Sequence, residues 1–222
     1  MSLADKLNYS LKAKEDMKKS LISKGTPCTA ETPLGDYASL IDSISGESDL
    51  HNIITDGLVF ILPIRSYSSN YNGKITDPNN SFQIPLGNNP RTFEAKFNCK
   101  QAGYLFNFGQ YTLRQSFSIS NDRIVCYSND FRFKNVPAFN EDVYLSVVYD
   151  GSKFLVYWNG ILDEEISTPA LNTVSNGSFY LACWNGWGEY FLGTIYYTRI
   201  YNRILSASEI YYNYLASGGK VQ

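Results

Sequence analysis

The chain has 222 residues, with 19 basic and 21 acidic side chains and a formal net charge of −2. This balance excludes a protein that binds nucleic acid mainly by charge, because such a protein needs an excess of basic residues. No apolar run approaches the roughly 18 residues of a membrane-spanning helix, and the first residues lack the apolar stretch of a secretory signal, so neither a membrane partner nor export by that route is expected.

The first fifty residues differ in composition from the rest and form the first predicted domain, residues 1–50. They contain only two of the aromatic residues, Tyr9 and Tyr37. No Gly or Pro interrupts residues 3–24, which predicts a helix with an apolar stripe, and a second short helix is predicted to begin at Thr32. A single helix cannot bury such a stripe alone. The segment is therefore predicted to assemble copies of the chain.

Residues 51–222 form the second predicted domain, in which apolar residues recur with a period of two. Asn159-Gly160 predicts a two-residue hairpin, because both residues must take positive φ. About a dozen strands are predicted before Ser206 and Glu209, which form a capping box for a final helix. The pattern predicts a mainly β chain, an antiparallel β-sandwich or jelly roll preceded by a short α-helical domain. The predicted core-facing sets are Phe93, Ala95 and Phe97; Val143, Leu145, Val147 and Tyr149; and Phe154, Val156 and Trp158.

Four stretches of the β segment resemble the laminin-G-like, concanavalin A-like jelly roll. Residues 56–63 are similar to the opening strand of that family, and residues 90–97 to a strand that often reads Arg-Thr-φ-Glu, where φ is apolar. Residues 148–160 resemble its central hairpin, and residues 191–210 its last strand and the capped helix that follows. The resemblance covers nearly all of 51–222 and implies the fold. It implies no particular ligand, because the family includes sugar binders, protein binders, hydrolases and structural modules.

The first fifty residues resemble the head segment of tail and baseplate proteins of phages that infect Gram-positive bacteria. The predicted helix, Lys24-Gly25 and residues 32–44 carry this resemblance. Joined to a jelly roll, it implies a receptor-binding tail protein of the virion, made in the bacterial cytoplasm, that assembles as a homotrimer and docks to other phage tail or baseplate proteins. The jelly roll would bind a host cell-surface glycan. A structural tail protein with a protein-binding or architectural jelly roll and a cell-wall glycan hydrolase are the alternatives.

Catalytic residues are not predicted, and an enzyme is not expected. The count of 34 aromatic residues (18 Tyr, 13 Phe and 3 Trp) beside one histidine is more typical of a β-rich binding module. The histidine, His51, lies in the predicted linker, whereas nucleophilic triads need a histidine in a cleft. The run Asp163-Glu164-Glu165 lacks the alternate spacing that places hydrolase carboxylates on one strand face, and an exposed charged strand explains it better.

No cofactor is expected, and calcium is the one metal left open. The cysteines match no zinc pattern, and three of them (Cys99, Cys126 and Cys183) are predicted to be small buried hydrophobic residues. Some laminin-G-like domains hold calcium at the sandwich rim through aspartate, asparagine and carbonyl oxygens, and this chain places aspartates near turns. Turn formation is the favoured explanation for them. These aspartates are Asp56, Asp77, Asp122, Asp130 and Asp150.

A glycan site is predicted in the loop at 184–190, because sugars bind with their C–H face on an aromatic ring and their hydroxyls on amides and carboxylates. The alternative is that Trp184 or Trp187 closes one end of the core. A second candidate is the stretch 66–73, which is rich in Tyr, Ser, Asn and Gly, as binding loops often are. Trp158 is instead expected in the core. The candidate ligand-binding residues are Trp184, Asn185, Trp187, Glu189, Tyr190, Tyr67, Asn70 and Tyr71.

Overall fold

The computed structural model describes residues 53–67, 73–77, 79–112, 114–126, 129–184 and 188–220, apart from the side chains of 62–67. The predicted helical domain 1–50 lies outside these ranges. The described residues form twelve strands and one helix. No helix among them is long and apolar enough to span a membrane.

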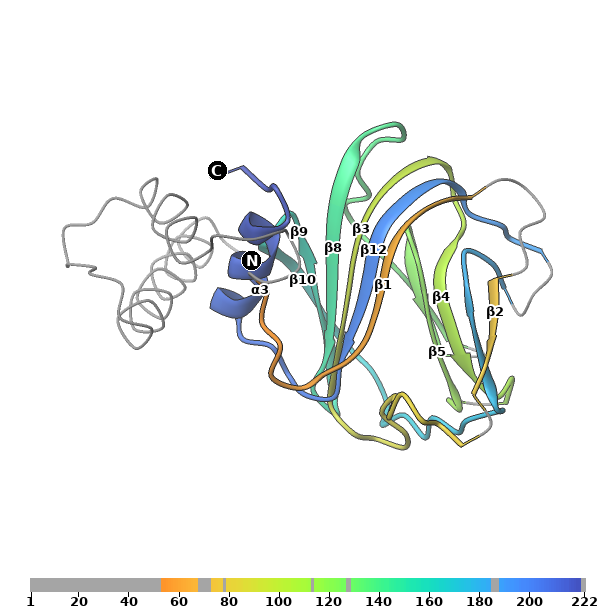
Figure 1. Ribbon diagram of the computed structural model, residues 1–222. Coiled ribbons are helices and arrows are strands. Elements are labelled where there is room, and N and C mark those ends of the chain that lie inside the picture. Colours follow the sequence, from red (N-terminus) through yellow and green to blue (C-terminus); the bar gives the residue numbers. More distant parts are fainter. Residues whose placement is uncertain are drawn as a thin grey trace.

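The strands form two six-stranded antiparallel sheets packed face to face, as Figure 1 shows. Sheet A has the order β1-β12-β3-β8-β9-β10, and sheet B has the order β2-β11-β4-β5-β6-β7. The predicted antiparallel sandwich is confirmed for this part of the chain. The strands are β1 (Leu58–Tyr67), β2 (Gly73–Thr76), β3 (Arg91–Gln101), β4 (Tyr104–Gly109), β5 (Ser116–Ser120), β6 (Arg123–Val125), β7 (Asp130–Arg132), β8 (Asp142–Tyr149), β9 (Lys153–Trp158), β10 (Ile161–Ser167), β11 (Ser178–Leu181) and β12 (Leu192–Tyr201).

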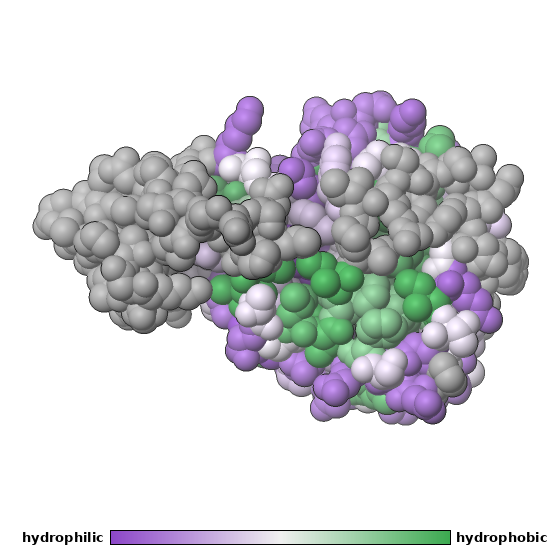
Figure 2. All heavy atoms as spheres, in the orientation of Figure 1, coloured by the Kyte–Doolittle hydropathy of each residue, from purple (hydrophilic) through white to green (hydrophobic). Residues whose placement is uncertain are grey.

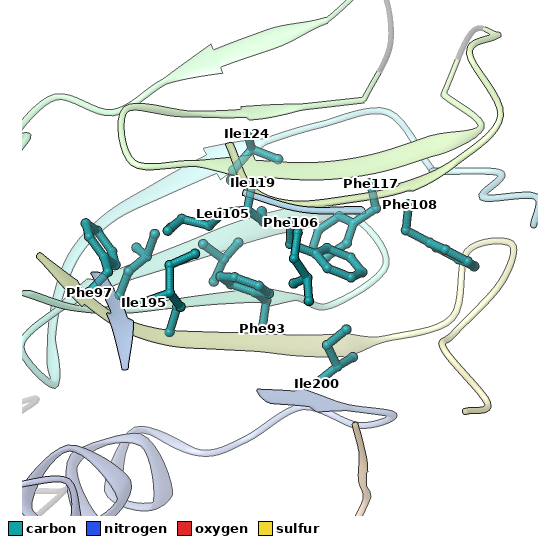
Figure 3. Packing of buried hydrophobic residues seen from close by; sticks show 14 of the residues in the cluster. Phe93, Phe97, Leu105, Phe106, Phe108, Phe117, Ile119, Ile124, Ile195 and Ile200 are labelled. Atoms are coloured by element: carbon teal, nitrogen blue, oxygen red, sulfur yellow. The ribbon is translucent and has the colours of Figure 1, made fainter. Parts of the chain in front are cut away.

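The main core lies between the two sheets and is rich in phenylalanine (Figure 3). Sheet A contributes Phe93, Phe97 and Ile200, and sheet B contributes Phe106 and Phe117 among others. All three predicted core-facing sets belong to this core, including Trp158. Cys99, Cys126 and Cys183 are buried, which confirms their assignment as small buried residues.

The outer face of sheet A is covered by helix α3 (Ala207–Ala216) (Figure 1). The predicted capping box is present, with Ser206 accepting from the backbone of Glu209 and Glu209 accepting from that of Ser206. A second apolar cluster fills the space beneath the helix and includes Tyr144 and Tyr157. Because this face is occupied, a ligand site on the sandwich has to be sought elsewhere.

The hairpin between β9 and β10 has the predicted turn. Asn159 and Gly160 both have positive φ, at 50° and 78°. A Cβ on Gly160 would lie 2.8 Å from the ring of Tyr211 in α3, so the glycine also allows the helix to pack closely. The turn thus connects β9 to β10 and also leaves room for α3 to pack on sheet A.

The open edge next to β1 carries exposed apolar side chains, and Figure 2 shows apolar residues gathered on this face. Ile61 of β1 is 36% exposed and Phe82 is 38% exposed. The Phe82 ring packs edge-on against Phe60 and Phe179, with centroids 5.5 and 5.7 Å away. These contacts close one end of the core between the two sheets.

Candidate functional site

The outer face of sheet B carries a row of polar side chains. Because Phe117 and Ile119 of β5 face the core, Ser116 and Ser118 face outward, as alternation along a strand requires. Asn107 of β4 stands opposite Ser118 in the register. None of the described residues bonds to Asn107 Nδ2 or to the two serine Oγ atoms, although all three are buried.

Three aromatic rings meet beside this row, and we call Tyr104, Tyr111 and Trp184 the aromatic group. The centroid of Trp184 lies 4.9 Å from that of Tyr104 and 5.1 Å from that of Tyr111. The hydroxyl of Tyr111 donates to Asn107 Oδ1 at 2.9 Å. Tyr104 is buried, whereas Tyr111 and Trp184 are partly exposed. The two outer rings therefore offer aromatic surface to a ligand, over a buried tyrosine.

The loop that carries Trp184 is tied to sheet B by backbone hydrogen bonds. Ala182 N donates to Leu105 O at 3.3 Å, and Tyr104 N donates to Glu189 O at 3.2 Å. Phe191 N donates to Ala182 O at 2.9 Å and closes the base of the loop.

Among the described residues of this loop, two other than glycine have positive φ, Ala182 at 60° and Glu189 at 41°. Such a conformation costs on the order of 1–3 kcal/mol and is found mostly where the surroundings impose it, often at functional sites.

Gly103 allows this loop to approach β4. A Cβ at Gly103 would lie 2.6 Å from both Phe191 Cα and Tyr190 O, closer than any Cβ can come. Asn121 holds the glycine from the other side, accepting from Gly103 N at 2.9 Å and donating to Gly103 O at 3.3 Å.

A group of charged side chains borders the aromatic group, and we call Asp122, Arg123, Asp130, Arg132 and Glu189 the charged cluster. Arg123 lies at its centre, with nitrogen–oxygen distances of 2.5 Å to Glu189, 3.6 Å to Asp130 and 3.7 Å to Asp122. Arg132 pairs with Asp122 at 2.9 Å. The Glu189 and Asp130 side chains are 56% and 51% exposed, so both can reach a ligand.

Arg123 connects the charged cluster to the aromatic group. Its guanidinium carbon lies 5.8 Å from the centroid of the Tyr104 ring, a cation–π distance. Burial raises the pKa of Tyr104 to about 12, and the hydrogen bond to Arg123 opposes part of that rise. Burial acts to lower the pKa of Arg123, but Tyr104, Asp122 and Glu189 outweigh it and raise that pKa. At neutral pH the tyrosine is therefore neutral and the arginine charged.

The structure brings together some of the predicted site residues. Trp184 and Glu189 both belong to this region, and the backbone oxygen of Tyr190 accepts from Gln101 Nε2 at 3.3 Å. Tyr67 pairs with Gly193 through the β1–β12 ladder, and its side chain is not described. The predicted residues Asn185, Trp187, Asn70 and Tyr71 lie outside the described residues.

Sequence reasoning missed Tyr104, Tyr111 and Arg123. They lie about 60 to 80 residues before the loop, and only the pairing of β4 with β11 brings them to it. The signal that could have found Tyr104 is its place at the start of a strand, directly after Gly103.

The acidic run at 163–165 is not the fully exposed strand that was predicted. Glu164 is buried, because a bulge after Leu162 turns it inward, where its carboxylate accepts from Lys134 N at 2.9 Å. Glu165 is exposed as expected and pairs with Lys153 at 2.7 Å. None of these contacts forms a pair of facing carboxylates.

The aspartates near turns have structural partners. Asp77 accepts from the backbone and hydroxyl of Ser81, and Asp150 accepts from the backbone of Ser152 and Lys153. This confirms the turn-forming role for both. Among the described residues, no three His, Cys, Asp or Glu side chains are arranged to hold a metal ion.

A pocket of about 520 Å³ lies on the other side of the sandwich, between β8 and the end of α3. Two of its polar side chains bond to backbone oxygens of the same lining: Lys96 Nζ donates to Ser217 O at 2.8 Å, and the Tyr214 hydroxyl donates to Lys220 O at 3.1 Å. Tyr214 is buried and offers no open ring face. The outer face of sheet B therefore provides the better candidate site.

The sequence profile described as the concanavalin A-like lectin/glucanases superfamily, a laminin-G-type profile, matches residues 81–211, more than half of the chain. The chain belongs to this superfamily. No curated protein sequence matches it at a significant level.

Solved structures with the same fold share low sequence identity with this chain. Domain 4 of a Geobacillus stearothermophilus arabinanase, solved with arabinotriose, has 20% identity and a TM-score of 0.51 over 63% of this chain and 70% of that one. The CBM40 domain of a Ruminococcus gnavus sialidase, solved with α2,3-sialyllactose, has 13% identity and a TM-score of 0.56 over 74% and 100%. The Streptococcus pneumoniae sialidase NanB has 17% identity and a TM-score of 0.54 over 70% of this chain but only 28% of its own.

Proposed function

We propose that the jelly roll binds a host cell-surface glycan on the outer face of sheet B, without catalysing a reaction. The observation that carries this proposal is the aromatic group lying directly beside the charged cluster, joined through Tyr104 and Arg123. Binding sites commonly combine aromatic surface with a few well-placed polar groups. This is also the combination that a sugar requires, with one apolar C–H face and a rim of hydroxyls.

Each part of the site has a role in this proposal. Trp184 presents a partly exposed ring for the C–H face of a sugar. Glu189 and Asp130 accept hydrogen bonds from hydroxyls. Trp187 and Asn185 belong to the same loop and are proposed as further contacts, as are Tyr67, Asn70 and Tyr71.

The structural comparisons support the proposal only through the fold that the solved structures share with this chain. Two of the relatives, the arabinanase domain and the sialidase CBM40 domain, were solved with bound sugars. A non-enzymatic role is supported by the charged cluster, in which Arg123 pairs with all three carboxylates. A hydrolase needs one carboxyl group that can act as an acid and a second that faces it across the sugar.

We further propose that this glycan binder is a receptor-binding protein of a phage tail tip or baseplate. The support is the resemblance of residues 1–50 to the head segments of such proteins. In that role the head would form a homotrimer, dock to other tail proteins and place the jelly roll on the virion surface. Three linked sites would bind a repeating cell-wall polymer more tightly than one site, because later contacts become intramolecular.

Glycan-array binding of the full chain, followed by calorimetry with the best glycan, tests the proposed function. The expected result is specific binding that the Trp184→Ala variant loses. A chain that binds no glycan but retains a tail protein from a phage lysate would favour the structural alternative. Release of reducing sugar from cell-wall polymer would favour the hydrolase.

A further inference from the structure

The charges of the charged cluster indicate which kind of glycan fits beside Trp184. Its five members are three carboxylates (Asp122, Asp130 and Glu189) and two guanidinium groups (Arg123 and Arg132). Three negative charges against two positive charges leave a net charge of −1.

Both arginines of the cluster already have carboxylate partners. Arg123 has Glu189, Asp130 and Asp122 within 2.5–3.7 Å, and its side chain is only 14% exposed. Arg132 holds Asp122 at 2.9 Å. A carboxylate or phosphate of a ligand is recognised best by a guanidinium fork whose two N–H groups are open to it. At Arg123 an anionic ligand would have to displace an existing carboxylate.

Two of the three well-exposed members of the cluster are acceptors. Glu189 and Asp130 are more than half exposed. Arg132 is exposed as well, but it lies on the edge strand β7 and holds Asp122, whereas Arg123 is nearly covered. A ligand that approaches Trp184 from solvent therefore meets carboxylate oxygens before it meets Arg123. Hydroxyl groups donate to such oxygens, but ligand carboxylates and phosphates are repelled by them.

Resting on the proposed function, we propose that the site selects uncharged sugar residues and discriminates against glycans that carry a carboxylate or phosphate at the contacted position. The negative cluster sets this preference, and the aromatic group supplies affinity that does not depend on the charge of the sugar.

The test is an array of neutral oligosaccharides, each paired with an anionic counterpart, such as lactose with 3′-sialyllactose, maltotriose with its phosphate ester, and an oligoglucoside with the corresponding oligoglucuronide. For every pair that binds, the neutral member should bind about five- to tenfold more tightly, the scale of one screened charge at close range. Raising the salt concentration should reduce this ratio, because exposed charges are screened.

Substitutions in the cluster provide the second arm. Glu189→Gln should reduce the neutral-to-anionic ratio, and the double variant Asp130→Asn/Glu189→Gln, which changes the net charge from −1 to +1, should bring it to one or invert it. Glu165→Gln is the matched control, since Glu165 is an exposed glutamate, paired with Lys153, on the other sheet. It should leave the ratio unchanged. Melting temperatures identify any variant that fails to fold, and the salt dependence of the parent chain then still decides the question.

The possible failures are distinct. A parent chain that prefers the anionic members, or a ratio that neither salt nor Glu189→Gln alters, would overturn this inference while glycan binding stands. Absence of binding to every glycan would overturn the proposed function and this inference with it.

Discussion

Trp184, in the loop after β11, packs against Tyr104, the first residue of β4, with ring centroids 4.9 Å apart and planes inclined by 47°. The contact joins a loop to the outer face of sheet B, so the loop aromatic is supported by a buried ring. It is also in contact with Tyr111, 5.1 Å away. A tryptophan held from two sides loses little rotamer freedom on binding, which favours its use as a ligand platform.

Trp184→Ala should weaken glycan binding by about 1–3 kcal/mol, the scale of an aromatic hot spot. Trp158 provides the comparison, because it is a buried core tryptophan. Trp158→Ala should instead cost about 3–5 kcal/mol of stability, while the folded fraction binds with the parent affinity. Calorimetric titration and urea denaturation of both variants measure the two effects. A Trp184→Ala variant that loses stability on the Trp158 scale and keeps its affinity would show that Trp184 closes the core.

Trp187→Ala extends the same experiment to a predicted contact outside the described residues. If Trp187 stacks on the sugar, its removal should lower affinity by about 1–3 kcal/mol and barely change the melting temperature. A loss of about 3–5 kcal/mol of stability would instead place Trp187 in the core.

Gly103→Ala should displace the binding loop. The new Cβ would lie 2.6 Å from Phe191 Cα and Tyr190 O, both backbone atoms that cannot turn aside. We expect a loss of about 1–3 kcal/mol of stability, typical of overpacking, together with weaker glycan binding. Ala102→Ser is the control, since Ala102 is an exposed neighbour. Unchanged affinity in a folded Gly103→Ala chain would mean that the loop position does not control the site.

Glu94, buried beneath α3, should make the stability of the folded chain depend on pH. Burial raises the pKa of its carboxyl, and Arg199 with hydrogen bonds from Asn213 and Ser146 offsets only part of that rise. The folded chain therefore holds this proton more tightly than the unfolded chain. The tighter binding of this proton stabilises the folded chain fully below the ordinary glutamate pKa, and this stabilisation is lost as the pH rises through the raised pKa.

The matching variant is Glu94→Gln, which does not titrate. Relative to this variant, the parent chain should lose up to about 1.4 kcal/mol of unfolding free energy per pH unit, starting just above pH 4.5 and ending at the raised pKa. Urea denaturation at a series of pH values measures the difference. A parent chain that instead gains stability over the variant as the pH rises would show that Arg199 holds the carboxylate ionised.

The two domains should separate cleanly when the chain begins at Asp49. Such a fragment still contains Ile54, whose backbone is bonded to the jelly roll on both sides. Ile54 N donates to Asn213 Oδ1 at 2.8 Å, and Ile54 O accepts from the Tyr201 hydroxyl at 3.0 Å. The fragment should be folded and monomeric, because it has its own core. The full chain should be a trimer by light scattering. A full chain that is monomeric at micromolar concentration would contradict the role assigned to residues 1–50.

The sequence predicted most of the sandwich because alternation decides which side of a strand is buried. Phe93, Ala95 and Phe97 face the core as their spacing requires. What alternation could not show is that the opposite face of β3 is buried as well, where Glu94 lies beneath α3. Helix α3, which covers this face, lies more than a hundred residues further along the chain, so no local sequence pattern indicates that the face is buried.

The candidate site was predictable only where its residues lie in one loop. Trp184 and Glu189 stand within six residues of each other, and their types indicate sugar binding. Tyr104 and Arg123 reach them through strand pairing and through the ion pair between Arg123 and Glu189. Such long-range contacts depend on the register of sheet B, which the sequence does not specify residue by residue.

The most direct test of glycan binding on sheet B is a glycan array probed in parallel with the full chain and with its Trp184→Ala variant, both shown to be folded. The structure predicts that the parent chain binds at least one cell-surface glycan and that the variant loses this signal. Equal binding by both chains, or no binding by the parent chain, would contradict the assignment of the site.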